Sequence, residues 1–257
     1  MNIIIITGAS SGIGMEFARQ MDDYFSNIDE FWLIARRRDK LEELAETLGH
    51  RSRILSMDIT KEAQLDRLED TLQEKNAKVC MLINAAGYGL MGDFAGQNRE
   101  EMLGMIRLNC EALTAVTHRI IPYMKRNGRI IQMASSAAFL PQMDFAVYAA
   151  TKSYVLSFSK ALGEELREKE IYVTSVCPGP VDTPFFDIAE KTGSTLAVKK
   201  YTMVDAERVV SLALRDSYQK RSMSVCSLPI KSFMVATKLL PHDFYLKIMK
   251  VLKKREK

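Results

Sequence analysis

Tyr148 and Lys152 are the two side chains of this sequence best suited to moving a proton. They stand at positions i and i+4 of an expected helix, so both can face the same side. A phenol with its ordinary pKa near 10 is a poor base at neutral pH. The Lys152 ammonium, together with a cationic ring of a cofactor bound nearby, would lower that pKa toward the working range. Lys152 could also hydrogen-bond the ribose of a bound cofactor. The Tyr-x-x-x-Lys spacing alone is a weak signal, because a lysine-rich chain with nine tyrosines readily produces it by chance.

A serine hydroxyl could complete this chemistry. Ser135 lies thirteen residues before Tyr148 and directly after an expected strand over 129–133. In a doubly wound sheet that is the carboxyl end of a strand, where ligands bind. A hydroxyl there can stabilise a substrate oxygen as charge develops on it. Ser136 is an adjacent alternative, and either serine could instead cap a turn or helix.

A glycine-rich loop follows the first expected strand, with the sequence Thr7-Gly8-Ala9-Ser10-Ser11-Gly12-Ile13-Gly14. Glycines at this junction let the backbone turn tightly and approach a pyrophosphate, which the N-terminus of the next helix then faces. The loop therefore predicts a dinucleotide site, with a plain glycine-rich turn as the alternative.

The end of the second expected strand indicates which dinucleotide binds. NAD-binding sheets place an acid about 20 residues past the glycines, but here the residues are Ala35-Arg36-Arg37-Arg38. Arginine holds a 2′-phosphate through charge-assisted, fork-shaped hydrogen bonds. The sequence therefore predicts NADP(H), with Arg36 as the first choice for the phosphate and Arg37 as the second. Pairing of these arginines with Asp39 or Glu42 is the alternative.

Elements that could position these residues alternate along the chain. Expected strands cover residues 3–6, 31–35, 53–57, 79–83, 129–133, 171–177 and 223–226. Expected helices cover residues 13–25, 39–48, 61–75, 100–124 with a break near Asn109, 147–169 and 206–217. Strands that are apolar throughout and separated by helices predict a parallel sheet covered on both faces. We expect one α/β domain with a Rossmann-type doubly wound sheet.

Composition excludes several other classes of protein. The net charge of +4 is mild, and basic and acidic residues are interspersed over most of the chain, so nucleic acid is not an expected partner. Residues 3–6 predict a strand and not a signal peptide, and no apolar run reaches the length of a membrane span. Scattered cysteines and histidines predict no metal site and fit buried thiols in a reducing cytoplasm. These residues are Cys80, Cys110, Cys177, Cys226, His50, His118 and His242.

Taken together, the motifs resemble those of the short-chain dehydrogenase/reductase family, in its order and at its spacings over residues 1 to about 185. They are Thr7-Gly8-x-x-x-Gly12-x-Gly14, Asn84-Ala85-Ala86-Gly87, Ser135, Tyr148-x-x-x-Lys152 and Pro178-Gly179-Pro180-Val181-Asp182-Thr183. The resemblance implies a Rossmann fold, a nicotinamide cofactor and a Tyr–Lys–Ser catalytic set, with Asn109 in the place of a fourth member. It also implies that Asp58 contacts the adenine and Thr183 the carboxamide. The family usually has a second asparagine where this chain has Ala85.

The cofactor set that follows combines the loop, the arginines and the family motifs. It comprises Gly8, Ser10, Ser11, Gly12, Ile13, Gly14, Arg36, Arg37, Asp58, Asn84, Ala85, Ala86, Gly87, Tyr148, Lys152, Pro178, Gly179, Val181 and Thr183.

The substrate region implied by the resemblance runs from about Pro184 to the end of the chain. Its aromatic residues, with those just before Tyr148, fit a small apolar carbonyl compound, and ordinary core or lid packing is the alternative. These residues are Leu140, Met143, Phe145, Phe185 and Phe186. We expect residues 1–227 to form the NADP(H)-binding domain and 228–257 a helical extension of it. Between Asp243 and Leu252 the apolar residues recur at helical spacing with lysines between them. That helix could cover a cleft, pack in a homodimer or homotetramer, or lie peripherally on a membrane.

These observations predict a cytoplasmic oxidoreductase that exchanges hydride between NADP(H) and a carbonyl or secondary alcohol. A non-catalytic NADP(H)-binding regulatory protein is the alternative, and an enzyme acting on a C=C or C=N bond is a third possibility. The joint presence of Tyr148, Lys152, Ser135 and Asn109 favours carbonyl chemistry, because a binding module needs no such set.

Overall fold

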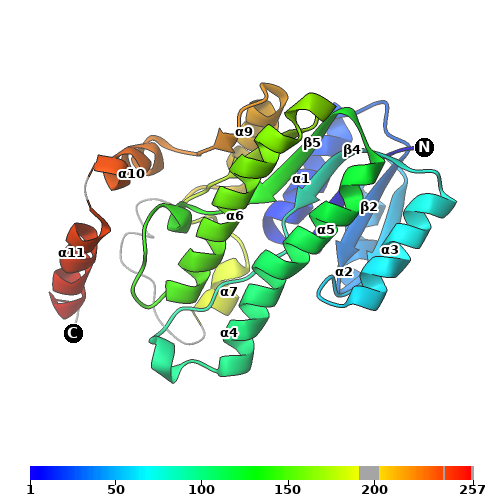
Figure 1. Cartoon of the computed structure of the whole chain (residues 1–257). Coiled ribbons are helices and arrows are strands. Elements are labelled where there is room, and N and C mark those ends of the chain that lie inside the picture. Colours follow the sequence, from blue (N-terminus) through cyan, green and yellow to red (C-terminus); the bar gives the residue numbers. More distant parts are fainter. Residues whose placement is uncertain (191–202, 240, 256–257) are drawn as a thin grey trace.

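The computed structural model describes residues 1–190, 203–239 and 241–255. Within them, seven parallel strands form one sheet in the order β3-β2-β1-β4-β5-β6-β7 (Figure 1). The strands are β1 (Asn2–Thr7), β2 (Glu30–Ala35), β3 (Ser52–Ser56), β4 (Lys78–Asn84), β5 (Met124–Met133), β6 (Tyr172–Val176) and β7 (Met223–Ser224). Strand order reverses between β1 and β4, which opens a crevice at their carboxyl ends. The predicted Rossmann-type doubly wound fold is confirmed.

Helices cover both faces of this sheet. They are α1 (Gly12–Tyr24), α2 (Arg38–Thr47), α3 (Glu62–Glu74), α5 (Leu113–Ile120), α6 (Ala146–Glu165) and α9 (Ala206–Tyr218). Two shorter helices, α4 (Arg99–Ile106) and α7 (Phe185–Ala189), contribute residues that pack around Tyr148 instead. Ile4 and Ile6 of β1 pack in the core under α1, α2 and α9. Ile3 and Ile5 pack in the opposite core under α3, α5 and α6. Strand β1 is apolar at every one of these positions because both of its faces are buried.

The expected helix over 100–124 differs from the observed one in two ways. The break near Asn109 is a π-helical turn, Arg107–Ala112, between α4 and α5. The predicted end at Met124 is wrong, since α5 ends at Ile120 and Met124 begins β5. Pro122 lies in the intervening 3-10 turn, Ile121–Tyr123, and it has no N–H with which to continue an α-helix.

After β7 the chain forms two further helices, α10 (Leu228–Leu239) and α11 (His242–Arg255). The helix expected between Asp243 and Leu252 is therefore present. Figure 1 shows both helices at the left of the view, with α6 and α7 between them and the labelled strands. The Tyr245 hydroxyl donates to the Ala236 carbonyl and ties α11 to α10. No helix in the described part of the chain is long and apolar enough to cross a bilayer.

Candidate active site

A cavity of about 1410 Å³ opens at the carboxyl ends of the central strands. Every residue of the predicted cofactor set lines it except Asn84. Ser135 also lines it, whereas the fourth expected catalytic residue, Asn109, does not. Residues 191–202 and 240 of the expected substrate region lie outside the described residues, as do the side chains of residues 252–257.

The glycine loop is compact in a way that only glycine allows. Gly8 has φ of 71° and Gly12 has φ of 54°, in the left-handed region. A Cβ atom on Gly8 would lie 2.7 Å from the Ala86 nitrogen, and one on Gly14 would lie 2.4 Å from the Gly8 carbonyl oxygen. A Cβ on Gly12 would meet the Thr183 side chain at 3.3 Å. The loop thus presents bare backbone to the cavity at the start of α1, the arrangement that holds a pyrophosphate.

The family's second asparagine is replaced by Ala85, and the backbone holds this loop. The Ala85 N–H donates to the Thr7 carbonyl at 3.2 Å. The Ala86 N–H donates to the Thr7 hydroxyl at 3.2 Å. Asn84 does not face the cavity, because its side-chain amide donates to the buried Thr117 hydroxyl of α5 at 3.0 Å. The β4 loop therefore keeps its attachment to β1 without the missing side chain.

The three consecutive arginines have three different environments. The Arg37 guanidinium donates to the Ser10 and Ser11 hydroxyls at 3.0 and 2.8 Å and so braces the glycine loop. Arg38 pairs with Glu42 at 2.8 Å, outside the cavity. Arg36 lines the cavity beside Asp58. Arg38 thus forms the ion pair with a nearby acid that was the alternative to phosphate binding for all three arginines.

Asp58 lies at the adenine end implied by the family resemblance. Burial acts to raise the pKa of its carboxyl, but hydrogen bonds from Thr60 and the positive charge of Arg36 outweigh it and hold the pKa below its usual value. The Thr60 N–H and hydroxyl donate to the carboxylate at 3.0 and 2.7 Å. Asp58 is therefore a fixed acceptor in the cavity wall.

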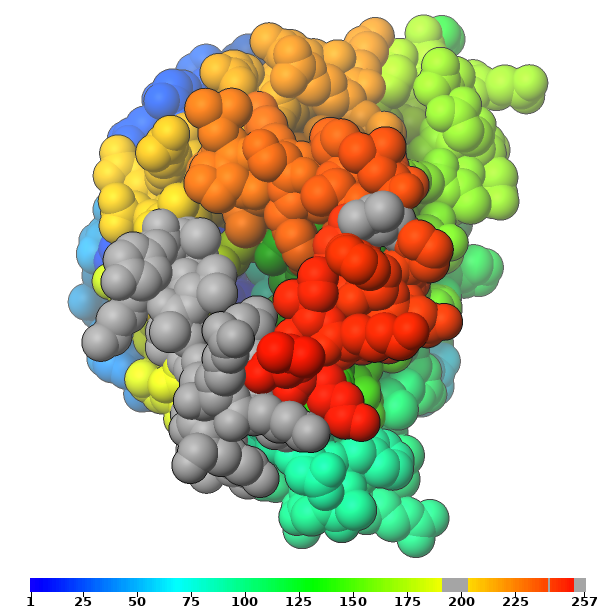
Figure 2. All heavy atoms as spheres, turned by 90° about the vertical axis from the view of Figure 1, so that its left-hand side faces the viewer, coloured from blue at the N-terminus to red at the C-terminus, as the bar shows by residue number. Residues whose placement is uncertain are grey.

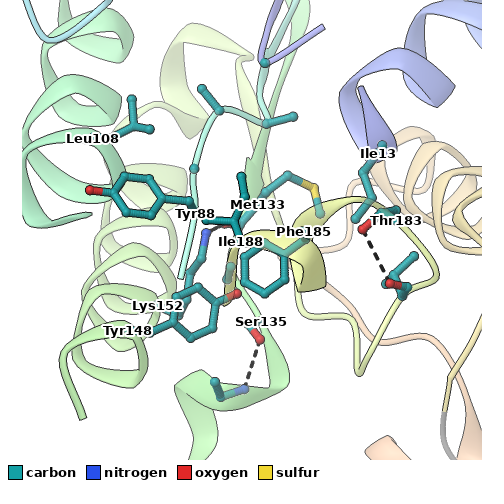
Figure 3. A pocket seen from close by; sticks show the side chains of 18 of the residues that line it. Ile13, Tyr88, Leu108, Met133, Ser135, Tyr148, Lys152, Thr183, Phe185 and Ile188 are labelled. Atoms are coloured by element: carbon teal, nitrogen blue, oxygen red, sulfur yellow. Dashed lines mark hydrogen bonds between the residues drawn. The ribbon is translucent and has the colours of Figure 1, made fainter. Parts of the chain in front are cut away.

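Tyr148 and Lys152 project from the first turns of α6 into the cavity, and Ser135 reaches the same region from the end of β5 (Figure 3). Burial raises the pKa of Tyr148 to about 12, and a hydrogen bond with Ser135 acts against this increase. The physical reason for the increase is desolvation of a phenol that is 7 % exposed. The lowering expected from Lys152 and a cationic nicotinamide ring concerns the cofactor-bound protein.

Lys152 lies behind the tyrosine ring. Its Nζ donates to the Met133 carbonyl at 2.7 Å and lies 5.6 Å from the centre of the Tyr148 ring. Burial lowers the pKa of Lys152 to about 8. The ammonium form still predominates at neutral pH, so a positive charge stands close to the phenol.

Asn109 is fully buried, and its side-chain amide forms hydrogen bonds with other groups of the protein. Its carbonyl oxygen accepts from the Tyr88 N–H at 3.1 Å, and its amide donates to the Tyr88 carbonyl and the Thr151 hydroxyl at 2.9 and 3.1 Å. A Cβ atom on Gly87 would lie 2.9 Å from Asn109 Oδ1. The side chain therefore fixes the loop after β4, and Thr151 joins it to α6.

The sequence interpretation missed Tyr88. Both of its backbone polar groups bond to Asn109, its hydroxyl donates to the Glu101 carbonyl at 2.7 Å, and its ring lines the cavity. Its position between Gly87 and Gly89 is the only sequence signal, and that signal does not specify a contact.

The other end of the cavity is apolar. Phe145 stacks on Tyr148 with ring centres 4.3 Å apart, and Phe185 lies 5.5 Å from the same ring. Leu140, Met143 and Phe186 also line this part, as the sequence predicts. The C-terminal helices supply further lining residues, namely Pro229, Ile230, Phe233, Tyr245, Ile248 and Met249. No group of three or more metal-ligating side chains occurs within the part of the chain that the structure describes.

A doubly wound sheet with a glycine loop after its first strand and a cavity at the strand-order reversal defines a dinucleotide-binding protein of Rossmann type. The model of the short chain dehydrogenase family matches residues 2–193. The chain belongs to the short-chain dehydrogenase/reductase family of oxidoreductases. Serine 3-dehydrogenase of Agrobacterium fabrum is 32 % identical over 187 residues, which cover 71 % of this chain and 73 % of that protein.

Two solved structures are similar throughout. A short-chain dehydrogenase from Sphingobium yanoikuyae in complex with NADPH has a TM-score of 0.79 and 28 % identity, and the match covers 93 % of this chain and 92 % of that one. A 3-ketoacyl-(acyl-carrier-protein) reductase from Brucella melitensis complexed with NADH has a TM-score of 0.76 and 25 % identity, covering 88 % and 96 %. Members of this structural group thus bind either nicotinamide dinucleotide.

Proposed function

We propose that this protein is an NADP(H)-dependent oxidoreductase that interconverts a carbonyl and a secondary alcohol in an apolar substrate. The observation that carries the proposal is the position of Tyr148. Its ring is flanked by Phe145 and Phe185 at the apolar end, while Lys152 and the glycine loop line the dinucleotide end of the same cavity.

The residues around the cavity fit a nicotinamide dinucleotide. Gly8, Gly12 and Gly14 let the loop pack closely against Ala86 and Thr183 and against its own backbone, so that its backbone lines the cavity at the start of α1, where a pyrophosphate would bind. Arg36 is placed to receive a 2′-phosphate, while Arg37 holds the serines of the loop. This arrangement supports NADP(H), although the similar NADH-bound reductase shows that the fold itself accepts both cofactors. When bound, the nicotinamide supplies or accepts the hydride of the reaction.

Tyr148 carries the proton. Because burial raises the pKa of Tyr148 to about 12, the phenol keeps its proton at neutral pH and is ready to donate it to a carbonyl oxygen. Ser135 donates a hydrogen bond to the same oxygen. The ammonium of Lys152 stabilises the phenolate that remains after the transfer. In the oxidative direction the same groups act in reverse, and Asn109 keeps the cavity wall fixed throughout.

Apolar side chains define the substrate end. The sheet is complete at β7, so α10 and α11 add no strand to it, although Ile230 of α10 packs in a core cluster with Val155 and Cys177. The residues Ile230, Phe233 and Met249 of these two helices nevertheless line the cavity. We therefore propose that residues 228–257 are a helical extension of the domain formed by 1–227, and that the inner face of this extension covers the substrate.

We also propose that the protein works in the cytoplasm as a homodimer or homotetramer. Support for self-association comes from apolar side chains exposed on α4 and α6. Leu103, Ile106 and Tyr154 are exposed to 37 %, 43 % and 42 %.

The direct test is consumption of NADPH by the purified protein with a panel of carbonyl compounds graded in size and polarity. Bulky apolar ketones should give faster turnover than small polar ones, and L-serine with NADP⁺ should be a poor substrate. Faster oxidation of serine than of any apolar alcohol would refute the proposed substrate class. Absence of turnover with every compound of the panel would refute the proposed reaction.

A further inference from the structure

The outer face of the two C-terminal helices exposes large apolar side chains. Leu228, Val235 and Leu239 of α10 are exposed to 78 %, 52 % and 75 %. Phe244, Ile248 and Val251 of α11 are exposed to 48 %, 42 % and 54 %. Figure 2 shows α10 in orange and α11 in red beside one another on a single face of the molecule. We call these six residues the outer stripe.

The stripe has helical order on both elements. Phe244, Ile248 and Val251 are spaced i, i+4 and i+7, so they form one line along α11. Tyr245 and Met249, on the adjoining side, line the cavity. The helix therefore has two adjoining apolar sides: one lines the cavity, the other is exposed, and Ile248 lies at the boundary between them.

Basic residues border the outer stripe. Lys231 and Lys238 on α10, and Lys247 and Lys250 on α11, are all exposed. Residues 228–257 hold eight of the chain's 36 lysines and arginines but only two of its 32 acids. The resulting charge of +6 exceeds the +4 of the whole chain, so the remainder is slightly acidic. Positive charge is thus concentrated in this segment of the sequence, and its four described lysines lie beside the exposed apolar residues.

We propose that the outer stripe and its lysines bind the surface of an anionic lipid bilayer. Apolar side chains enter the region between headgroups and acyl chains, and the lysines contact lipid phosphates, as in helices that lie in the membrane plane. A second copy of the chain is a poorer occupant, since a two-fold contact through this face would bring the same lysines together.

The position of the stripe has a consequence for the proposed function, on which this further step rests. Ile248 belongs to the stripe and also lines the cavity. The cavity rim therefore adjoins the membrane-facing surface, and an apolar substrate dissolved in the bilayer would reach the site without crossing bulk water.

Membrane binding can be measured without substrate or cofactor, which separates this proposal from the proposed reaction. The full-length protein is co-sedimented with neutral phosphatidylcholine vesicles and with vesicles that also contain phosphatidylglycerol. The wild type should partition onto the anionic vesicles and far less onto the neutral ones, and added salt should weaken binding.

Two double variants test the two parts of the surface. K247E/K250E reverses two charges, and F244Q/V251Q removes two apolar side chains of the stripe; these four residues do not line the cavity. Each pair should lower partition onto anionic vesicles by at least roughly tenfold. The charge-matched control is K75E/K169E. These exposed positions lie near the amino ends of β4 and β6, at the end of the sheet opposite the cavity. It should bind like the wild type.

Three results would overturn the proposal. One is equal partition of the wild type onto neutral and anionic vesicles. Another is an equal loss of binding in K75E/K169E and K247E/K250E, since net charge alone would then account for adsorption. The third is a wild type that binds no vesicles and is oligomeric, while the F244Q/V251Q variant is monomeric. A second copy of the chain would then be the occupant of the stripe.

Discussion

Arg36, Arg37 and Arg38 offer a discriminating test of cofactor preference, because they are adjacent in sequence and differ in surroundings. Arg36 lines the cavity beside Asp58. Arg37 bonds to Ser10 and Ser11 of the phosphate loop. Arg38 pairs with Glu42 outside the cavity. Alanine substitution should therefore give three different outcomes.

The expected magnitude follows from the bond that is lost. A charge-assisted hydrogen bond to phosphate contributes about 1.5–3 kcal/mol, and about 1.4 kcal/mol corresponds to a tenfold change in affinity. Arg36→Ala should weaken NADPH binding by roughly 10- to 100-fold while leaving NADH binding nearly unchanged. Arg37→Ala should weaken both, because it removes two hydrogen bonds that hold the loop for either cofactor. Arg38→Ala should alter neither.

Fluorescence titration of the purified variants with NADPH and NADH gives the required dissociation constants. The ratio of the two constants isolates the 2′-phosphate, since all other contacts are shared. Tighter binding of NADH than of NADPH by the wild type would refute the reasoning. So would an Arg38→Ala variant that loses as much NADPH affinity as Arg36→Ala.

Three further predictions concern the tail and the buried polar groups. A chain truncated after Ser227 should keep its NADPH affinity but show KM for apolar ketones raised by about tenfold or more, since the cavity loses one wall; steady-state kinetics would show an unchanged KM if the tail is no lid. Burial lowers the pKa of Lys152 to about 8 from 10.5. Below pH 8 the amine is charged in both the folded and the unfolded state, and its burial then lowers the free energy of unfolding. This loss of stability shrinks as pH rises from 8 to 10.5, where the amine becomes neutral in both states. The cofactor-free wild type should therefore gain about 3 kcal/mol of unfolding free energy relative to Lys152→Met over that range, and parallel urea-denaturation curves with no relative gain would contradict it. Asn109→Ala should lower the free energy of unfolding by about 2–5 kcal/mol, because Tyr88 and Thr151 lose buried partners; a thermal melt equal to wild type would refute that.

The sequence predicted the sheet and its loop well because those features depend on local chemistry. Apolar strands such as 3–6, glycines at a strand–helix junction and the i, i+4 spacing of Tyr148 and Lys152 each constrain the backbone within a few residues. The break near Asn109 was also predicted, and in the structure it is the π-helical turn Arg107–Ala112. Pro122 was the local signal that could have corrected the end of the helix before β5.

Features that depend on tertiary packing could not be predicted in the same way. The bonds between Asn109 and Tyr88 join segments 21 residues apart and depend on the π-helical turn. Desolvation of Tyr148 depends on Phe145 and Phe185 closing around it, so the raised pKa of this phenol in the cofactor-free protein could not be predicted from the sequence. Likewise, the roles of Arg36 and Arg37 differ through side-chain direction, which the triplet of arginines does not encode.

The central claim is that Tyr148 moves the proton while other residues hold the cofactor. The most direct test is Tyr148→Phe, which removes one hydroxyl and keeps the ring against Phe145 and Phe185. With the best ketone of the panel, its kcat should fall below roughly 1 % of wild type, in line with the loss of a general acid. Its dissociation constant for NADPH, measured on the same sample, should be unchanged. A variant that kept more than a few per cent of wild-type turnover with intact NADPH binding would contradict the account, because the proton would then have to come from another group.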